Sequence, residues 1–312
     1  MDPKQKVARL SIISNTLLTT GKLSVGLVMG SVGVLSEAIH SGLDLVASII
    51  AYFSVKQSAK PADEQHKYGH GKYENLAAII EALLIVIAAV AILLNAIPKL
   101  MHKNIEIEAL GLGMLVMGVS CVVNGWVSYK LMKVAKETDS PALEADALHL
   151  RTDVYTSLGV FISIGLIKLT GLTIIDPLVG IFVTLLILKA AYDLLHDSVA
   201  SMLDTKLPQA DEERIQLALE QYRDRFVSYH NLRTRKAGPQ RHVDLHLVVP
   251  RYRTIAEVHL LCDEIEAVLE KELPRSSILI HSEPCDPKYC DNCNASCQCR
   301  KNGVCIRSFD NK

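Results

Sequence analysis

Residues 36–44 read SEAIHSGLD and residues 147–153 read ALHLRTD, and both stretches lie inside apolar segments. Each contains a histidine that is followed four residues later by an aspartate. Side chains four residues apart share one face of a helix, so each helix could direct an imidazole nitrogen and a carboxylate oxygen to one point. Two such helices would supply four ligands, which is the tetrahedral number for zinc. The two stretches predict a metal site made of His40, Asp44, His149 and Asp153.

The alternative interpretation is that these four side chains only pair structurally, or that they lie near the membrane interface. Ionisable groups inside a membrane span are costly and usually functional, and the same spacing occurs twice, so we favour the metal site. Histidine must be neutral and aspartate ionised to bind a metal, so metal binding displaces protons. Histidine titrates near physiological pH. A site that opens to each side of a membrane in turn would therefore exchange metal for protons.

The composition indicates apolar spans followed by a polar domain. Hydrophobic residues make up 49% of the 312 residues, and the mean hydropathy is +0.23, a mixture that favours a membrane domain with a soluble domain attached. The net charge of -1 shows no bias toward nucleic acid. No cleavable signal peptide is expected, because no cleavage pattern accompanies the first apolar segment. Six segments approach the roughly 20 apolar residues of a span, and they cover residues 9–29, 33–55, 76–97, 107–130, 145–168 and 177–195.

Basic residues in the short loops predict the orientation of these spans. Most of them lie on the side that holds the N-terminus and the loop after the second span, whereas the other side holds only Lys99, Lys103 and Lys168. The basic side should be cytoplasmic, and six spans place both termini there. Ser140 and Asp176 each precede a proline, an arrangement that predicts a capped helix start at both positions.

The pattern changes after the membrane domain, which we assign to residues 1–206. Residues 242–249 alternate between apolar and polar side chains, as in a half-buried strand. Residues 207–284 are expected to form a cytoplasmic α+β domain in the order α-β-β-α-β. Its helices and strands are predicted over residues 210–226, 227–235, 242–249, 255–272 and 277–281.

The chain resembles the cation diffusion facilitator family, specifically its bacterial zinc and iron efflux branch. The resemblance covers residues 9–284 and rests on the two His/Asp pairs, on PADEQHKYGHGK at residues 61–72 and on HNLRTR at residues 230–235. It implies a homodimer of six-helix protomers in the lipid bilayer of a bacterial inner (plasma) membrane, with a metallochaperone-like cytoplasmic fold and proton-coupled efflux. Histidine at position 40, where some bacterial members carry aspartate, favours Zn²⁺ over Mn²⁺ or Mg²⁺ but does not exclude Cd²⁺, Co²⁺ or Fe²⁺.

Two further metal sites follow from the resemblance. The first lies between the second and third spans and consists of Asp63, His66 and His70. Either a helical turn or an irregular loop could bring His66 and His70 together. The second matches the family's dimer-bridging cluster and consists of His230, His246, His259, His281 and Glu283. The alternative for the first site is a solvated polar loop that binds no metal. The alternative for the second site is a set of ordinary surface histidines. Lys72 and Asp204 resemble a charge pair that links the membrane and cytoplasmic halves of the family's dimer.

Residues 285–312 depart from the family pattern, because they carry six of the eight cysteines of the chain. Cys290-x-x-Cys293 is a good half-site for zinc, and Cys297-x-Cys299 could complete a four-thiolate set. The alternatives are a disordered tail with reactive thiols and an iron–sulfur cluster, although the spacing matches neither common ferredoxin pattern. We predict a tail that binds soft metals in a reducing compartment, through Cys285, Cys290, Cys293, Cys297, Cys299 and Cys305.

These patterns favour an antiporter for divalent transition metals, with Zn²⁺ both as substrate and as a structural or regulatory ion. A metal sensor or scaffold without transport is the main alternative, although no member of the predicted quartet is missing. A membrane-anchored redox protein that uses the cysteine tail is a third reading. The sequence has no G-x-x-x-x-G-K-[ST] loop and no nucleophile-and-base arrangement, so we expect neither ATP-driven pumping, nor an organic cofactor, nor an enzyme.

Overall fold

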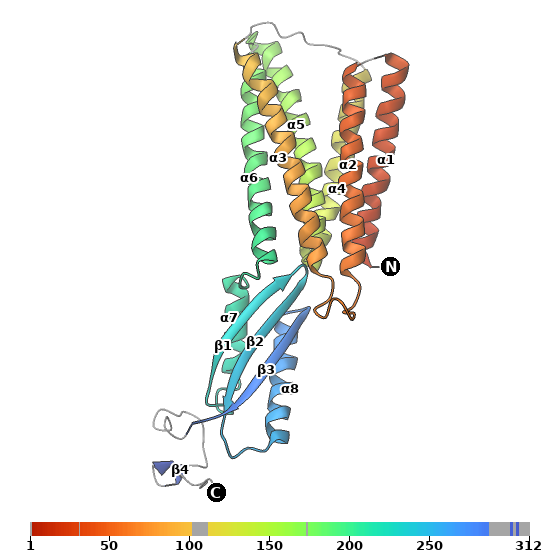
Figure 1. Ribbon diagram of the computed structural model, residues 1–312. Helices are drawn as coiled ribbons and strands as arrows, with labels where there is room; N and C mark the ends of the chain where they lie inside the picture. Colours follow the sequence, from red (N-terminus) through yellow and green to blue (C-terminus); the bar gives the residue numbers. More distant parts are fainter. Residues whose placement is uncertain are drawn as a thin grey trace. The chain divides into compact units, whose positions relative to one another are not determined.

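The computed structural model describes residues 2–30, 32–101, 112–172, 174–286, 300–301 and 304–305. The chain divides into two compact units, Met1–Met202 and Leu203–Lys312. The first unit is a set of long helices and the second is built around a small sheet (Figure 1).

Six long helices make up the described part of the first unit (Figure 1). Four of them are long and apolar enough to cross a membrane over Glu37–Ser58, Lys72–Leu94, Pro141–Ile167 and Ile175–Met202. Among the described residues, the first and fourth helices are not in this set, and the first expected residues of the fourth span, 107–111, lie outside the described part. The helices are α1 Pro3–Met29, α2 Val32–Ser58, α3 Lys72–Met101, α4 Leu112–Thr138, α5 Pro141–Thr170 and α6 Ile175–Met202.

One of the two expected helix caps is confirmed. The Ser140 side chain caps α5 by accepting a hydrogen bond from the backbone of Leu143, and a proline follows it in the first turn. Asp176 is not a cap, because α6 already begins at Ile175. Its carboxylate instead accepts a hydrogen bond from the Ser163 hydroxyl on α5 at 2.7 Å.

The helices of the first unit pack mainly in pairs, with α1 against α2, α3 against α6 and α4 against α5. Five of them meet in one buried cluster near the end that carries the α2–α3 loop. Small side chains let helix backbones approach closely in membrane proteins. The cluster includes Ala8, Val55, Ala77, Val127 and Ala142, one from each of α1 to α5.

The second unit has the expected order of helices and strands. Its three-stranded sheet has the order β1-β2-β3, with β1 antiparallel to β2 and β2 parallel to β3. The first helix ends at Glu220, earlier than expected, because turns follow it as far as Arg225. The elements are α7 Gln209–Glu220, β1 Ser228–Ala237, β2 Gln240–Val249, α8 Ile255–Glu272 and β3 Ser276–Pro284, and a short pair in the tail joins β4 Arg300–Lys301 to β5 Val304–Cys305.

The core of the second unit lies between the sheet and the two helices. The alternation of β2 is confirmed, because Val243, Leu245 and Leu247 are completely buried on one face of the strand. They pack in one cluster with residues of α8 that include Leu261 and Ile265. Each aliphatic side chain buried in this way contributes about 1.5–3 kcal/mol of transfer free energy. The opposite face of the sheet is therefore available to polar side chains.

Candidate functional site

The four residues of the predicted quartet come together between α2 and α5. The Nε2 atom of His149 lies 3.0 Å from Oδ1 of Asp44, and Nε2 of His40 lies 3.4 Å from Oδ1 of Asp153. His40 Nε2 is also 4.0 Å from Asp44 Oδ1. Each histidine thus contacts the aspartate of the other helix more closely than the aspartate of its own helix.

These separations match the size of a metal site. Two ligands of a tetrahedral zinc ion, each about 2.0–2.1 Å from the ion, lie roughly 3.3–3.4 Å apart. One ligand atom from each of His40, Asp44 and Asp153 lies within 4.8 Å of the others. His149 joins this group because its Nε2 atom contacts Oδ1 of Asp44. The geometry can therefore accept a small divalent cation after only slight adjustment of the side chains.

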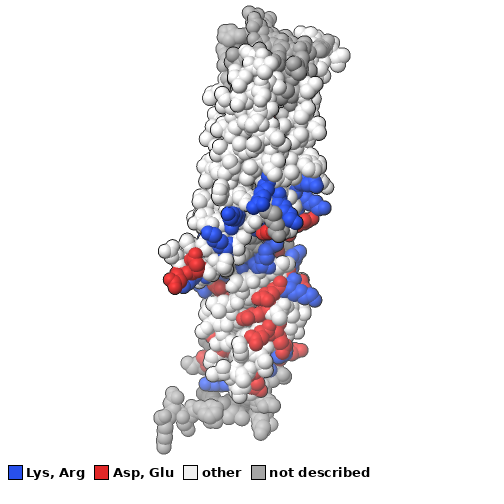
Figure 2. Space-filling model, turned by 90° about the vertical axis from the view of Figure 1, so that its right-hand side faces the viewer, with Lys and Arg blue, Asp and Glu red and all other residues white. Residues whose placement is uncertain are grey.

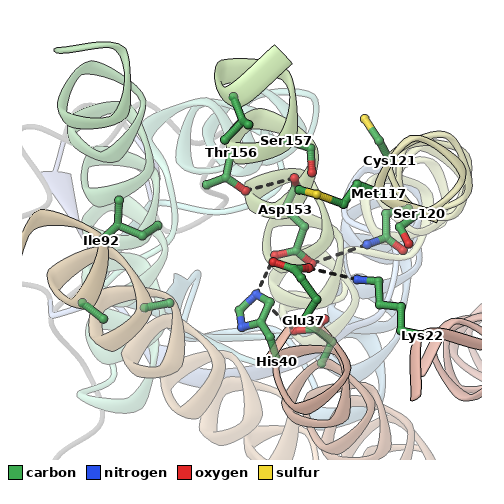
Figure 3. A pocket seen from close by; sticks show the side chains of 15 residues that line it. Lys22, Glu37, His40, Ile92, Met117, Ser120, Cys121, Asp153, Thr156 and Ser157 are labelled. Atoms are coloured by element: carbon green, nitrogen blue, oxygen red, sulfur yellow. Dashed lines mark hydrogen bonds and ion pairs between the residues drawn. The ribbon is translucent and has the colours of Figure 1, made fainter. Parts of the chain in front are cut away.

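The quartet is closed on one side and open on the other. The Asp44 and His149 side chains are only 4% and 8% exposed, whereas that of His40 is 43% exposed. Asp153 is intermediate and borders a cavity of about 340 Å³ together with His40 (Figure 3). A cation could enter or leave the site through this cavity.

A polar stripe on α1 runs past the quartet, and sequence analysis missed it as a unit. Ser11, Asn15, Thr19 and Lys22 follow helical spacing and face α2. Asn15 donates to Ser48 Oγ at 2.5 Å and Thr19 donates to the backbone oxygen of Ser41 at 2.8 Å. These bonds hold α1 to the helix that carries His40 and Asp44. The sequence does carry a signal for this stripe, because polar residues recur at helical spacing within the first apolar segment.

Three further acids are completely buried in the first unit, namely Glu74 and Glu81 on α3 and Asp146 on α5. Both carboxylate oxygens of Glu81 lack a hydrogen-bond partner among the described residues. Snorkelling of Glu81 to the membrane interface does not fit this burial. Asp146 stands one helical turn before His149, a spacing that the sequence shows but that we had not connected to the quartet.

The second predicted cluster forms in the loop between α2 and α3. Oδ1 of Asp63 lies 3.3 Å from Nδ1 of His66, and Oδ2 lies 3.2 Å from Nε2 of His70. A loop, not a helical turn, brings the two histidines together, and Gly69 adopts a left-handed φ of 79° within it. A backbone hydrogen bond from His66, joined by one from Gln65, lowers the pKa of the exposed Asp63 carboxyl. The carboxylate is thus kept in the form that binds metal.

The third cluster lies on the exposed face of the second unit's sheet. His230, His246 and His281 are direct neighbours on β1, β2 and β3. Glu283 stands two residues after His281 on the same face of β3, and its carboxylate oxygens lie 2.8 Å from His246 Nδ1 and 3.4 Å from His230 Nε2. His281 Nε2 is 3.8 Å from Glu283. The register between β1 and β2 shifts immediately after His230, as in a β-bulge, where Asn231 has a positive φ of 50°.

The remaining predicted residues contact other partners. His259 is exposed on α8, with its Nδ1 atom 3.5 Å from the Asp263 carboxylate. Lys72 donates to the backbone oxygen of Met202 at 3.2 Å within the first unit, and Asp204 accepts from Arg235 at 3.2 Å within the second. A pair between Lys72 and Asp204 stays a prediction.

The structure describes little of the cysteine tail. Cys285 is buried and forms no disulfide with another described residue. Cys305 lies in the short strand β5, and its side chain is not described. Cys290, Cys293, Cys297 and Cys299 lie outside the described residues, so the ligand set of the tail stays a prediction.

Comparison with known proteins places both units in one family. Residues 8–203 match the family model described as the cation efflux transmembrane domain. Residues 207–285 match the model described as the cytoplasmic domain of cation efflux proteins. The two models together cover nearly all residues that the structure describes.

Individual relatives agree with these matches. The chain is 35% identical over 279 residues to the uncharacterized transporter sll1263 of Synechocystis sp., covering 88% of this chain and 89% of that protein. It is 30% identical over 283 residues to the cation-efflux pump FieF of Salmonella choleraesuis, covering 89% and 93%. A solved structure of the zinc transporter CzrB in its zinc form is 40% identical over 25% of this chain and 90% of that chain, with a TM-score of 0.25. The chain therefore belongs to the cation efflux family, the cation diffusion facilitators, and is a membrane transporter of metal cations.

Proposed function

We propose that this protein exports Zn²⁺ from the cytoplasm in exchange for protons and that His40, Asp44, His149 and Asp153 form its transport site. The observation that carries the proposal is the meeting of two imidazoles and two carboxylates from α2 and α5, with separations of 3.0–4.0 Å, beside a cavity. Neither helix alone could supply this ligand set.

The contacts within the quartet support proton coupling. When a histidine of the quartet is protonated, the proton that it donates to an aspartate lies between the two side chains, where a metal ion would otherwise bind. Metal binding requires the neutral imidazole and the ionised carboxylate, so a proton and a metal ion compete for the site. The 3.0 Å contact between His149 and Asp44 places an imidazole nitrogen and a carboxylate oxygen where a proton or a metal ion would use the same two atoms.

Ligand chemistry supports Zn²⁺ as the substrate. Mixed nitrogen and oxygen ligands suit zinc, whereas Mg²⁺ and Mn²⁺ prefer oxygen alone. Cd²⁺, Co²⁺ and Fe²⁺ can use the same ligands, so they belong in any test of the site.

We further propose that all six helices of the first unit cross the bilayer and that both termini are cytoplasmic. Lys and Arg side chains gather in a band near one end of the helices, while the helical surface beyond the band is white (Figure 2). This distribution follows the positive-inside rule. The polar stripe of α1 is turned toward α2, which makes this helix compatible with a span despite its lower hydropathy.

The second unit is proposed to bind metal and to hold two copies of the chain together. His230, His246, His281 and Glu283 form a cluster on the sheet without His259. The resemblance to the family assigns all five residues to a dimer-bridging site, so we propose that His259 contributes its imidazole in the homodimer. The cysteine tail is proposed to dock or sense soft metal ions.

Transport by the purified protein in liposomes with a pH gradient tests the proposal. We expect Zn²⁺ flux that depends on the gradient and that disappears in Asp153→Ala. Asp193→Ala changes an exposed acid on α6 and serves as the matched control, which should retain flux. Equal flux in Asp153→Ala and wild type would contradict the assigned site, and flux that ignores the gradient would contradict proton coupling.

A further inference from the structure

The cavity beside the quartet contains polar groups that the quartet does not use. Its walls come from α1, α2, α3, α4 and α5 (Figure 3). Glu37 precedes His40 on α2, and Thr156 and Val160 follow Asp153 on α5. These positions place the cavity on the side of the quartet away from the α2–α3 loop, toward the ends of the helices that we assign to the outer side of the membrane.

A lysine ammonium is fixed in this cavity. The Lys22 side chain is only 7% exposed, and its Nζ atom donates to Ser41 Oγ at 2.8 Å and to Glu37 Oε2 at 3.3 Å. Figure 3 shows Lys22 on α1 reaching toward Glu37 on α2. A buried cation within a membrane domain is costly unless it is paired, and such groups usually have a function. A positive charge one helical turn from the ligand of an exported cation requires a specific explanation.

Helix α4 adds two oxygen atoms to the same cavity. Ser120 and Asn124 lie one turn apart, and both residues are 5% exposed. Ser120 Oγ and Asn124 Oδ1 have no hydrogen-bond partner among the described residues. The amide nitrogen of Asn124 donates to Asp153 at 3.5 Å. Buried polar atoms without partners are uncommon, so these two oxygens point to a ligand that enters the cavity.

We propose that Glu37, Ser120 and Asn124 form a second cation-binding station, which receives the hydrated metal ion as it leaves the quartet. Carboxylate, hydroxyl and amide oxygens together with water are ligands for a partly hydrated divalent cation. Lys22 competes with the metal ion for Glu37. When the ion leaves, the Lys22 ammonium binds the Glu37 carboxylate in its place. The exchange keeps the carboxylate paired after release and prevents the ion from returning.

This inference rests on the proposed direction of export but can be tested apart from transport. Zn²⁺ retained by the full-length protein in detergent is counted by equilibrium dialysis for wild type, Lys22→Met, Lys22→Arg and the double variant Lys22→Met/Glu37→Gln. We expect Lys22→Met to retain about one additional ion per chain, because no ammonium then competes for Glu37. The double variant and Lys22→Arg should match wild type. Equal stoichiometry in Lys22→Met and wild type would overturn the station.

The α4 ligands are tested in the Lys22→Met background by adding Ser120→Ala or Asn124→Ala. Each should weaken binding of the additional ion by about tenfold, the effect of about 1.4 kcal/mol. Retention of the ion at full affinity in both variants would remove α4 from the station. Glu37 is half-exposed (42% of its side chain), so the loss of Lys22 leaves it in contact with water and should permit folding. If Lys22→Met nevertheless fails to fold, Glu37→Gln alone is compared with wild type at Zn²⁺ concentrations high enough to displace the Lys22 ammonium from Glu37. Glu37→Gln should then retain less Zn²⁺ than wild type, and equal retention would contradict the proposal.

Flux measurements separate this inference from the proposed function. Lys22→Met should lower kcat about tenfold through slow release, with KM unchanged or lower, and the added Glu37→Gln should restore kcat. A raised KM with unchanged kcat in Lys22→Met would contradict the station. Loss of flux in wild type, or flux that persists in Asp153→Ala, would instead contradict the proposed function and would leave the binding result valid.

Discussion

Replacing Asp44 by asparagine tests the transport site at its most buried carboxylate. Oδ1 of Asp44 lies 3.0 Å from His149 and 4.0 Å from His40, and the Asp44 side chain is only 4% exposed. Asparagine preserves the volume and an oxygen acceptor but removes the negative charge. The substitution therefore changes the electrostatics of the site without opening a cavity.

The magnitude follows from this burial. Removing one partner of a buried charged interaction costs about 3–5 kcal/mol. At about 1.4 kcal/mol per factor of ten, Zn²⁺ should bind to the quartet roughly 10²- to 10³-fold more weakly, or beyond. An exposed carboxylate with the same chemistry contributes about 0–1 kcal/mol, so Asp193→Asn on α6 should stay close to wild type.

Initial rates of Zn²⁺ uptake into liposomes, measured over a range of concentrations, give KM and kcat for wild type and both variants. We expect KM to rise by at least about a hundredfold in Asp44→Asn, and thermal unfolding of the purified protein verifies that the variant is folded. A KM within threefold of wild type, in protein that is fully folded, would refute the assignment of Asp44 as a ligand.

Four further predictions concern the loop, the second unit and the tail. Glu283→Gln should reduce the affinity of the sheet cluster for Zn²⁺ by about one to two orders of magnitude, because three histidines lose their shared carboxylate. Isothermal titration calorimetry with Zn²⁺ measures the difference, and Glu270→Gln, which changes an exposed acid on α8, is the control variant. Leu245→Ala should destabilise the second unit by about 2–5 kcal/mol, because Leu245 is completely buried; denaturant unfolding of the full chain followed by a probe in this unit checks the value. The lowered pKa of Asp63 means that any stabilisation by its carboxylate is present above the ordinary aspartate pKa of about 3.9 and is lost only as pH falls through the lower folded value. ¹³C NMR should therefore find the Asp63 carboxylate mostly ionised at a pH of about 3.9, and a carboxyl that is at least half protonated at that pH would contradict the prediction. Deleting residues 286–312 should lower the number of bound metal ions and slow transport at low metal, and unchanged stoichiometry and transport would remove the tail from metal handling.

Several features of the second unit could be predicted because they depend on short stretches of chain. The alternation along residues 242–249 and the amphipathic pattern of residues 255–272 each depend on neighbours within one element, and β2 and α8 follow them closely. The boundaries of α7 and α6 were less predictable, since turn formation after Glu220 and the bond between Ser163 and Asp176 depend on residues outside those helices.

The sequence by itself determined which side chains could serve as ligands, because the four-residue spacing of His40 and Asp44, and of His149 and Asp153, is a property of each helix alone. Only the tertiary structure decided that each histidine contacts the aspartate of the other helix, and that His230, His246 and Glu283 meet on the sheet. It also decided that Lys22 pairs with Glu37 inside a cavity. The physical reason is that these contacts join residues on different elements, whose separation depends on packing and strand register and not on any local period of the sequence.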